Sequence, residues 1–277
     1  MSNRGAVAGA ILGVLLVTVA LLAPWLAGDP IARDIDHGLS ALGAPLPPSA
    51  DAPLGTDHLG RDVWARLAAG ARYSLSVGAL ATALALALGV AVGTLAGVAG
   101  GWLDMVLMRT VDLVLALPVV LVAILLAMLL RESALASSSA PVIVTLAALG
   151  WPAPARVVRA KARVLATSAH VAAARALGAG TARIVTRHLA PNLLGIVVVL
   201  ATLGFAQSLL CEAILSYLGL GPPPPEPSWG RMLYEGRGYY RTAPHLVLAP
   251  GAAIVLAVVT FHLLGEGLRA ALDPEDR

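Results

Sequence analysis

The sequence has few charged residues, one cysteine and few aromatic residues, and each shortage excludes a class of protein. Only 13% of its 277 residues are charged, about half of the share found in soluble domains, so the chain cannot cover a water-facing surface. The single cysteine, Cys211, excludes a disulfide framework and a CxxC metal site. Aromatic residues make up 4%, which leaves little material for stacking on bases, and we expect no nucleic-acid partner. Hydrophobic residues reach 58%, which indicates a protein embedded in the lipid bilayer.

Long runs with few charges predict an all-α membrane protein with six transmembrane helices. Lipid cannot satisfy exposed peptide groups, so each run is expected to be helical, and a crossing needs about 20 apolar residues. The run 140–155 is short and contains Pro152 and Pro154 near its end. The run 105–130 contains Pro118, where we expect a kink. The six runs are residues 6–27, 74–99, 105–130, 140–155, 193–217 and 246–268.

The basic residues are unevenly distributed, and this predicts the orientation of the chain. Residues 156–192 hold seven Lys and Arg residues and no acidic residue, whereas residues 29–73 hold four Arg against six Asp. The positive-inside rule places the first segment in the cytoplasm, which requires residues 140–155 to cross and puts both termini in the cytoplasm. The predicted organisation is a retained N-terminal transmembrane helix (1–27), an external loop (28–72), a transmembrane domain (73–268) and a cytoplasmic tail (269–277).

The chain carries no recognisable energy source of its own. A phosphate-binding loop needs a lysine beside glycines, but the only lysine, Lys161, has no glycine near it. Ion-coupled carriers place ionisable groups near the bilayer midplane, whereas Arg109, Asp112, Glu212 and Glu266 lie near the ends of the predicted spans. No pattern supports nucleophilic catalysis or metal binding. We therefore expect no catalytic residue, no cofactor and no metal on this chain.

The basic segment 156–192 is the place where a partner could supply energy. Residues 172–177 favour a short helix that ends at Gly178, because glycine adopts the left-handed conformation found after helix ends. Residues 181–189 favour a second helix, and Pro191 suits the first turn of the next membrane helix. The alternative is an ordinary basic loop that lies on anionic lipid headgroups. The residue pattern leaves both interpretations open.

The sequence Ala172-Ala173-Ala174-x-x-x-Gly178, followed after nine residues by His188-Leu189-Ala190-Pro191, resembles the "EAA" loop of ABC-transporter permease subunits. In that family the loop is a cytoplasmic coupling helix that docks on the ATPase. Ala172, His188 and Ala190 stand where the family has Glu, Ile and Leu. The resemblance implies an ATPase-coupling role for Ala172, Ala173, Ala174, Arg175, Gly178, Arg183 and Pro191.

Further stretches are similar to the "C-type" permeases of dipeptide, oligopeptide and nickel importers. They are residues 54–63, 70–75, 212–221, 227–233 and 265–274. The resemblance implies the type I ABC importer permease fold in a bacterial inner membrane. It also implies a second homologous permease, an external substrate-binding protein and two ATPase subunits that hold ATP and Mg²⁺. Asp57, Arg61 and Asp62 either brace the structure or contact the external partner. Trp229 is either an anchor at the membrane interface or a contact for the substrate or the external partner. The sequence leaves these roles open.

The expected function is that of a permease subunit in an ATP-driven importer for dipeptides or oligopeptides. Nickel or glutathione import is the alternative within the same family. A carrier or channel driven by ions and acting alone, and an assembly protein without transport, are the alternatives from other classes. Two overlapping G-x-x-x-G spacings, at Gly89, Gly93 and Gly97, predict close helix packing, either within the chain or between subunits.

Overall fold

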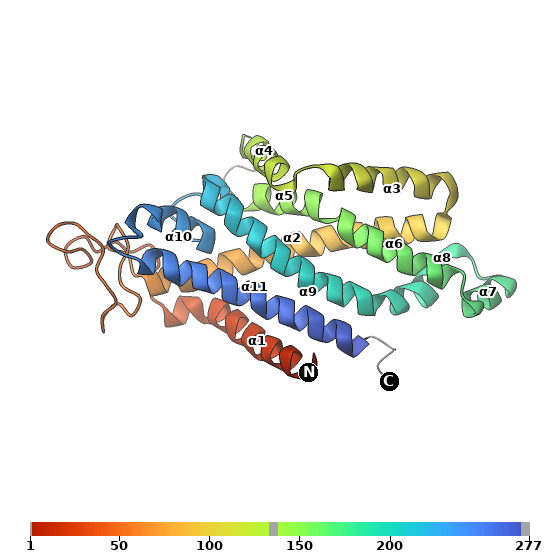
Figure 1. The fold of residues 1–277 in the computed structure, drawn as a ribbon, viewed down its shortest axis with the longest axis horizontal. Helices are drawn as coiled ribbons and strands as arrows, with labels where there is room; N and C mark the ends of the chain where they lie inside the picture. Colours follow the sequence, from red (N-terminus) through yellow and green to blue (C-terminus); the bar gives the residue numbers. More distant parts are fainter. Residues whose placement is uncertain (1, 133–137, 273–277) are drawn as a thin grey trace.

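The structure, a computed structural model, describes residues 2–132 and 138–272, and these residues form helices joined by loops, with no β-strand. The long helices lie side by side in an elongated bundle (Figure 1). Residues 28–62 and α10 lie at one end of the bundle, and α7 lies at the other. The helices are α1 (Ser2–Leu26), α2 (Val63–Ala99), α3 (Gly101–Ala116), α4 (Val119–Arg131), α5 (Ala140–Gly150), α6 (Pro152–Ala166), α7 (Ala169–Ala176), α8 (Thr181–Ile184), α9 (Ala190–Leu215), α10 (Trp229–Gly236) and α11 (His245–Leu272), with short π- or 3₁₀-helical turns η1 (Val185–Leu189), η2 (Ser216–Leu220) and η3 (Arg237–Tyr239).

Two helices extend beyond the boundaries that the sequence predicts. Helix α2 begins at Val63, because the Asp62 carboxylate accepts a hydrogen bond from the backbone N–H of Trp64 and caps the helix. The predicted loop 28–72 therefore ends at residue 62. The charges of Arg66 and Arg72 interrupt the apolar pattern and hid this helical start. The Arg66 side chain is paired and buried, whereas Arg72 is exposed. Helix α11 continues to Leu272, so the predicted tail 269–277 begins inside a helix, and its residues 273–277 lie outside the described residues.

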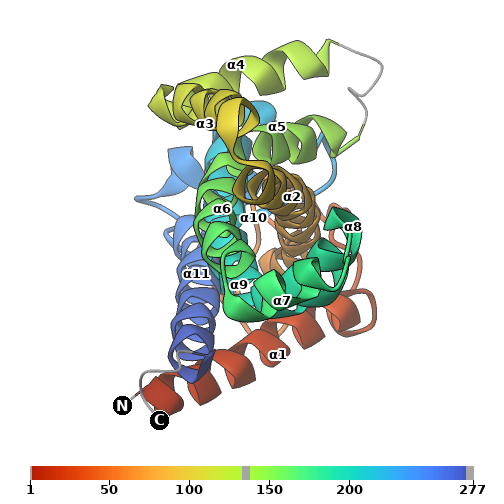
Figure 2. The same cartoon turned by 90° about the vertical axis from the view of Figure 1, so that its right-hand side faces the viewer.

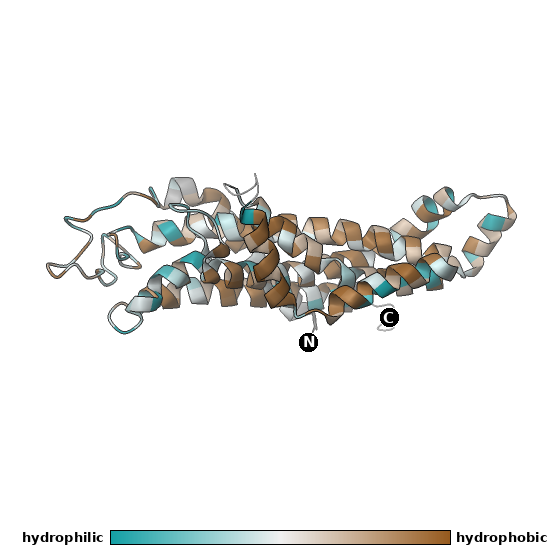
Figure 3. Cartoon of the chain, turned by 90° about the horizontal axis from the view of Figure 1, so that it is seen from above, coloured by the Kyte–Doolittle hydropathy of each residue, from teal (hydrophilic) through white to brown (hydrophobic). Residues whose placement is uncertain are grey.

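The apolar helices agree with a membrane-embedded bundle. Among the described residues, four segments are long and apolar enough to cross a membrane, namely Val63–Ala99, Ala140–Ala166, Thr181–Leu220 and His245–Ala271. The pair α3–α4 gives a fifth candidate, and α1 contains a shorter apolar stretch, Val7–Ala23. The short predicted span 140–155 is lengthened by α6, which starts at Pro152, a position that suits proline. Hydrophobic residues dominate the middle of the long helices, and hydrophilic residues gather toward the ends (Figure 3).

The predicted kink at Pro118 is a sharp break. The residue before a proline is disfavoured in the helical region, and Leu117 is extended, with φ −76° and ψ 144°. Helix α3 ends at Ala116 and α4 starts at Val119, and the two axes meet at 93°. The change of direction is visible in two perpendicular views (Figures 1 and 2). One predicted run thus becomes two helices of different direction.

Glycines on α2 allow close contact with α6. The G-x-x-x-G spacings therefore serve packing within the chain, the first of the two alternatives that the sequence leaves open. A Cβ atom on Gly93 would lie 2.5 Å from the carbonyl oxygen of Ala155, and one on Gly97 would lie 2.8 Å from that of Arg159. A Cβ on Gly89 would meet the carbonyl oxygen of Trp151 at 2.8 Å. The three glycines therefore pack within the chain.

Candidate functional site

The predicted coupling segment forms the far tip of the bundle. The chain leaves α6, forms α7, turns, and returns through α8 and η1 into α9 (Figures 1 and 2). Its inward face is apolar and buried: Val171 of α7 and Ile184 of α8 pack in one cluster with Val158 and Ala162 of α6 and with Leu189. This cluster fixes α7 to the ends of α6 and α9, so a displacement of α7 would be transmitted to both helices.

Gly178 ends α7 in a hydrogen-bonded turn. Its φ of +85° lies in the left-handed region that glycine adopts readily. Its N–H donates to the carbonyl of Arg175 (2.9 Å), and the N–H of Ala179 donates to the carbonyl of Ala174 (3.0 Å). These two bonds form a Schellman motif. The expected helix stop at Gly178 is therefore confirmed, and Pro191 lies in the first turn of α9, as expected.

The outward face of α7 is exposed and largely uncharged. Ala172 and Ala173 are exposed, while Ala174 is half-buried. Leu177, the C-cap residue of α7, is 89% exposed. The sequence does not identify it as a coupling residue, because the pattern does not show that a leucine before the glycine points outward. Arg175 and Arg183 are exposed beside this face. The residues predicted to contact the ATPase thus lie together in α7, α8 and the start of α9, at the tip of the bundle. Their role remains a prediction.

Three of the seven basic residues in the segment are paired with acidic residues on α3. The Arg159 guanidinium donates two hydrogen bonds to Asp104, one of them at 2.6 Å, and Arg163 lies 3.7 Å from the same carboxylate. Arg156 pairs with Asp112. The structure records no ion pair in the described residues for Lys161, Arg175, Arg183 and Arg187. Three of these four residues, Arg175, Arg183 and Arg187, lie in or beside α7, α8 and η1 at the tip of the bundle.

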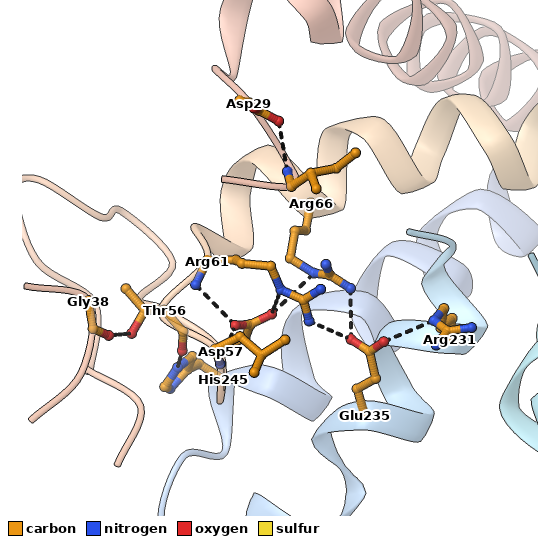
Figure 4. Close-up of polar contacts among 11 residues, drawn as sticks. Asp29, Gly38, Thr56, Asp57, Arg61, Arg66, Arg231, Glu235 and His245 are labelled. Atoms are coloured by element: carbon orange, nitrogen blue, oxygen red, sulfur yellow. Dashed lines mark hydrogen bonds and ion pairs between the residues drawn. The ribbon is translucent and has the colours of Figure 1, made fainter. Parts of the chain in front are cut away.

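The opposite end of the molecule, which we call the cap, consists of residues 28–62 together with α10. Its centre is a buried ion-pair network (Figure 4). The Asp57 carboxylate binds the Nε of Arg61 (2.7 Å) and lies 3.3 Å from the Nε of Arg66. Glu235 of α10 binds Arg61 (2.9 Å), Arg66 (2.7 Å) and Arg231 (2.9 Å). Asp57 and Glu235 thus join two stretches of chain that are far apart in the sequence.

The turns before α2 are built by side chains that satisfy local amides, as the bracing interpretation expects. The Asp57 carboxylate accepts hydrogen bonds from the backbone N–H groups of Leu59 (2.8 Å) and Arg61 (3.0 Å). The Thr56 hydroxyl donates to the carbonyl of Gly38 (2.6 Å) and accepts from the N–H of Leu46 (2.8 Å). These bonds hold residues 38–46 against the start of α2.

Trp229 is buried, so its side chain is not available to an external partner in this structure. It is 1% exposed, and its indole N–H donates to the carbonyl of Leu67 (3.0 Å). Its backbone N–H lies 3.3 Å from the Ser74 hydroxyl. A Cβ on the next residue, Gly230, would lie 2.3 Å from the carbonyl oxygen of Ala213, which brings α10 against α9. Asp57 and Arg61 are buried as well, and their contacts are those of a brace. Asp62 is the N-cap residue of α2.

One group in the cap has the residue types of a metal site. Ligand atoms of Asp57, His58 and Glu235 lie within 4.8 Å of one another, a proximity that the sequence did not reveal. Both carboxylates already bind guanidinium groups of Arg61 and Arg66. Two adjacent fixed cations repel a metal ion, so the chemistry of this group fits an ion-pair network.

Comparison with known proteins assigns the chain to a family. The family model described as "Binding-protein-dependent transport system inner membrane component" matches residues 89–275. The chain belongs to this family. The permease is 38% identical over 275 residues to a protein named as a peptide transport system permease in Brucella abortus biovar 1 (strain 9-941), with 99% of this chain and 89% of that protein covered. It is 41% identical over 270 residues to the glutathione transport system permease protein GsiD of Shigella flexneri serotype 5b (strain 8401), with 98% and 86% covered.

A solved structure supports the same fold. The MetNI methionine ABC transporter, in an inward-facing conformation, matches with a TM-score of 0.60 and 22% identity, over 75% of the permease and 96% of that chain. The permease therefore has the ABC importer permease fold, and its family membership makes it a membrane component of a binding-protein-dependent transport system. The expected family, fold class and general function are confirmed, whereas six crossings and the positions of the termini stay predictions.

Proposed function

We propose that this permease is one of two homologous transmembrane subunits of an ATP-driven importer for dipeptides or oligopeptides in a bacterial inner membrane. ATP and Mg²⁺ are held by two separate ATPase subunits, and an external binding protein delivers the cargo. The tip that carries α7 faces the cytoplasm, and the cap faces outward. The charge asymmetry supports this orientation, because residues 156–192 hold seven Lys and Arg residues and no acidic residue, whereas residues 29–73 hold four Arg and six Asp.

The observation that carries the coupling proposal is the two-sided construction of α7. Val171 is completely buried on the inner side, whereas Leu177 is 89% exposed on the outer side. A leucine exposed to this extent offers apolar surface that an ATPase subunit can cover on docking, and burial of that surface is favourable. ATP binding would move the ATPase subunits, and the buried cluster would pass that movement to α6 and α9. The helix bundle would have two conformations, and the ATPase subunits would shift the equilibrium toward the conformation that they bind more tightly.

The cargo proposal rests on the relatives. One is named as a peptide transport permease, and another is named for glutathione, which is itself a small peptide. Nickel import remains the alternative, and a metal cargo would be substrate and not a resident cofactor of this chain. Uptake of a labelled dipeptide into proteoliposomes that contain the complete importer, in competition with glutathione or Ni²⁺, separates these cargoes. Competition by Ni²⁺ alone would contradict the peptide assignment.

The coupling proposal is tested by Leu177→Asp, with Leu42→Asp as the matched control. Leu42 is 96% exposed and lies in the cap, at the opposite end of the molecule. Burying a leucine contributes about 1.5–3 kcal/mol, so Leu177→Asp should weaken co-purification of the ATPase subunits at least about tenfold. Leu42→Asp should leave it unchanged. Equal recovery of the ATPase subunits with both variants would refute docking at α7.

A further inference from the structure

A cavity lies beside the break between α3 and α4 and takes no part in the coupling proposal. Its volume is about 290 Å³, close to the lower limit of about 300 Å³ for small-molecule sites. The end of α3, the start of α4 and the junction of α5 with α6 form part of its wall. These helices lie on the side of the bundle away from α1 (Figures 1 and 2). Helix α9 supplies the rest of the wall with Gln207, Ser208, Cys211, Ile214 and Leu215.

The cavity lies at mid-depth in the predicted membrane region. Along the axis of α9, Gln207 is about 21 Å from residue 193 and about 15 Å from residue 217, the two ends of the predicted span. The neighbouring hydroxyl of Ser208 lies 2.9 Å from that of Thr82 on α2, and Thr82 is about 12 Å from residue 74, the outer end of its predicted span. A hydrocarbon core is about 30 Å thick, so both helices place the cavity away from the headgroups.

The polar groups of the cavity are poorly suited to contact with lipid. Gln207 is exposed, and in the described residues its side chain has one recorded contact, 3.5 Å from the amide nitrogen to the Sγ of Cys211. An amide that lacks hydrogen bonds in hydrocarbon is costly. Polar groups at this depth therefore face the interior of a bundle or a water-filled space, and in transporters they mark substrate pathways.

The lining suits a peptide better than a metal cation. Among the described residues that form it, none is acidic, basic or histidine, so the carboxylate and imidazole ligands of metal sites are missing. The Gln207 amide can both donate and accept hydrogen bonds, as the peptide group does. The apolar walls beside it can accompany side chains of different kinds.

We propose that this cavity is a contact site for the peptide cargo within the permease, with the Gln207 amide bonding to the peptide backbone. The break between α3 and α4 supports this location, because discontinuous helices surround substrate sites in many transporters. The inference rests on the proposed peptide cargo but not on ATPase docking at α7.

The test uses Cys211, which lines the cavity and is the only cysteine of the chain. The complete importer in proteoliposomes is exposed on both sides to a charged methanethiosulfonate, which attacks thiols in water and does not enter hydrocarbon. Mass spectrometry gives the rate of modification with and without the dipeptide whose uptake the same vesicles show. The control is Val255→Cys in a Cys211→Ser background, since Val255 is 63% exposed on α11 and lies outside the cavity.

We expect Cys211 to react at least about tenfold faster than the control, because thiolates form in water, and saturating dipeptide to slow it about fivefold. Gln207→Ala should weaken this protection and raise the KM for uptake, and Gln207→Asn should keep part of both because it retains an amide. Ser76→Ala, which removes an exposed hydroxyl outside the cavity, should change neither.

Two results in vesicles that take up the dipeptide would overturn the contact site alone. One is a Cys211 as unreactive as the control, which would show that lipid or the second permease fills the cavity. The other is a reactive Cys211 that the dipeptide does not protect. Absence of dipeptide uptake in vesicles that import Ni²⁺ would instead contradict the proposed cargo, and this inference with it.

Discussion

Replacing Glu235 by alanine should destabilise the cap more than any surface substitution. The Glu235 carboxylate accepts from Arg61, Arg66 and Arg231 at 2.7–2.9 Å, and its side chain is 16% exposed. Arg66 is 1% exposed, and without Glu235 its only remaining ion-pair partner in the described residues is Asp57. Breaking a buried pair on one side costs about 3–5 kcal/mol. Because Glu235 keeps some solvent contact, we expect the lower figure, about 3 kcal/mol.

The assay is thermal unfolding of the detergent-solubilised permease. A loss of this size should lower Tm by about 5 °C, and Glu235→Gln should lie between the alanine variant and the wild type because it keeps an acceptor but loses the charge. Glu226→Ala, at an exposed position in the loop before α10, should stay within about 0.5 kcal/mol of the wild type.

A double-mutant cycle makes the reasoning refutable. The variant Arg61→Ala/Glu235→Ala should lose less stability than the sum of the two single variants, because each single change already breaks the Arg61–Glu235 ion pair and the double change breaks it only once. The expected coupling is about 0.5–3 kcal/mol. Additive losses, or a Glu235→Ala variant as stable as Glu226→Ala, would show that the network does not brace the cap.

Two glycine substitutions test the packing and the turn. Alanine normally stabilises a helix relative to glycine by about 1 kcal/mol, and Gly13→Ala, where the nearest atom is at 3.6 Å, should follow this rule. Gly93→Ala should instead destabilise the bundle by about 1–3 kcal/mol, since its Cβ would lie 2.5 Å from a carbonyl oxygen; a rise in Tm would contradict the α2–α6 contact. Gly178→Ala should lower the free energy of unfolding by about 1–2 kcal/mol and reduce ATPase co-purification. Its φ is +85°, and no atom lies within 4 Å of a Cβ at this position, so the cost comes from backbone strain and not from a clash. Gly180→Ala, which also has open space but a φ of −70°, should do neither, and equal behaviour of both variants would exclude backbone strain.

The candidate site was predictable where it depends on local backbone chemistry. Gly178 was expected to stop a helix, and it does so in a left-handed conformation. Pro191 was expected in the first turn of a helix and lies there. The site was not predictable where it depends on burial. Leu177 and Val171 are both apolar residues of one short segment, and only packing on α6 separates the exposed one from the buried one.

The sequence alone determined that the chain is a helical membrane protein, because lipid offers no partner to peptide groups and its apolar runs are too long for anything but helices. Its motifs also indicated the family. Tertiary structure decided which charges are neutralised. Asp104 pairs with Arg159, and Asp57 and Glu235 both pair with the same two arginines, Arg61 and Arg66. It also decided that Trp229 is buried and that α3 and α4 meet at 93°. Local preferences act within a few residues, whereas ion pairing, burial and direction arise only when distant segments are brought together by folding.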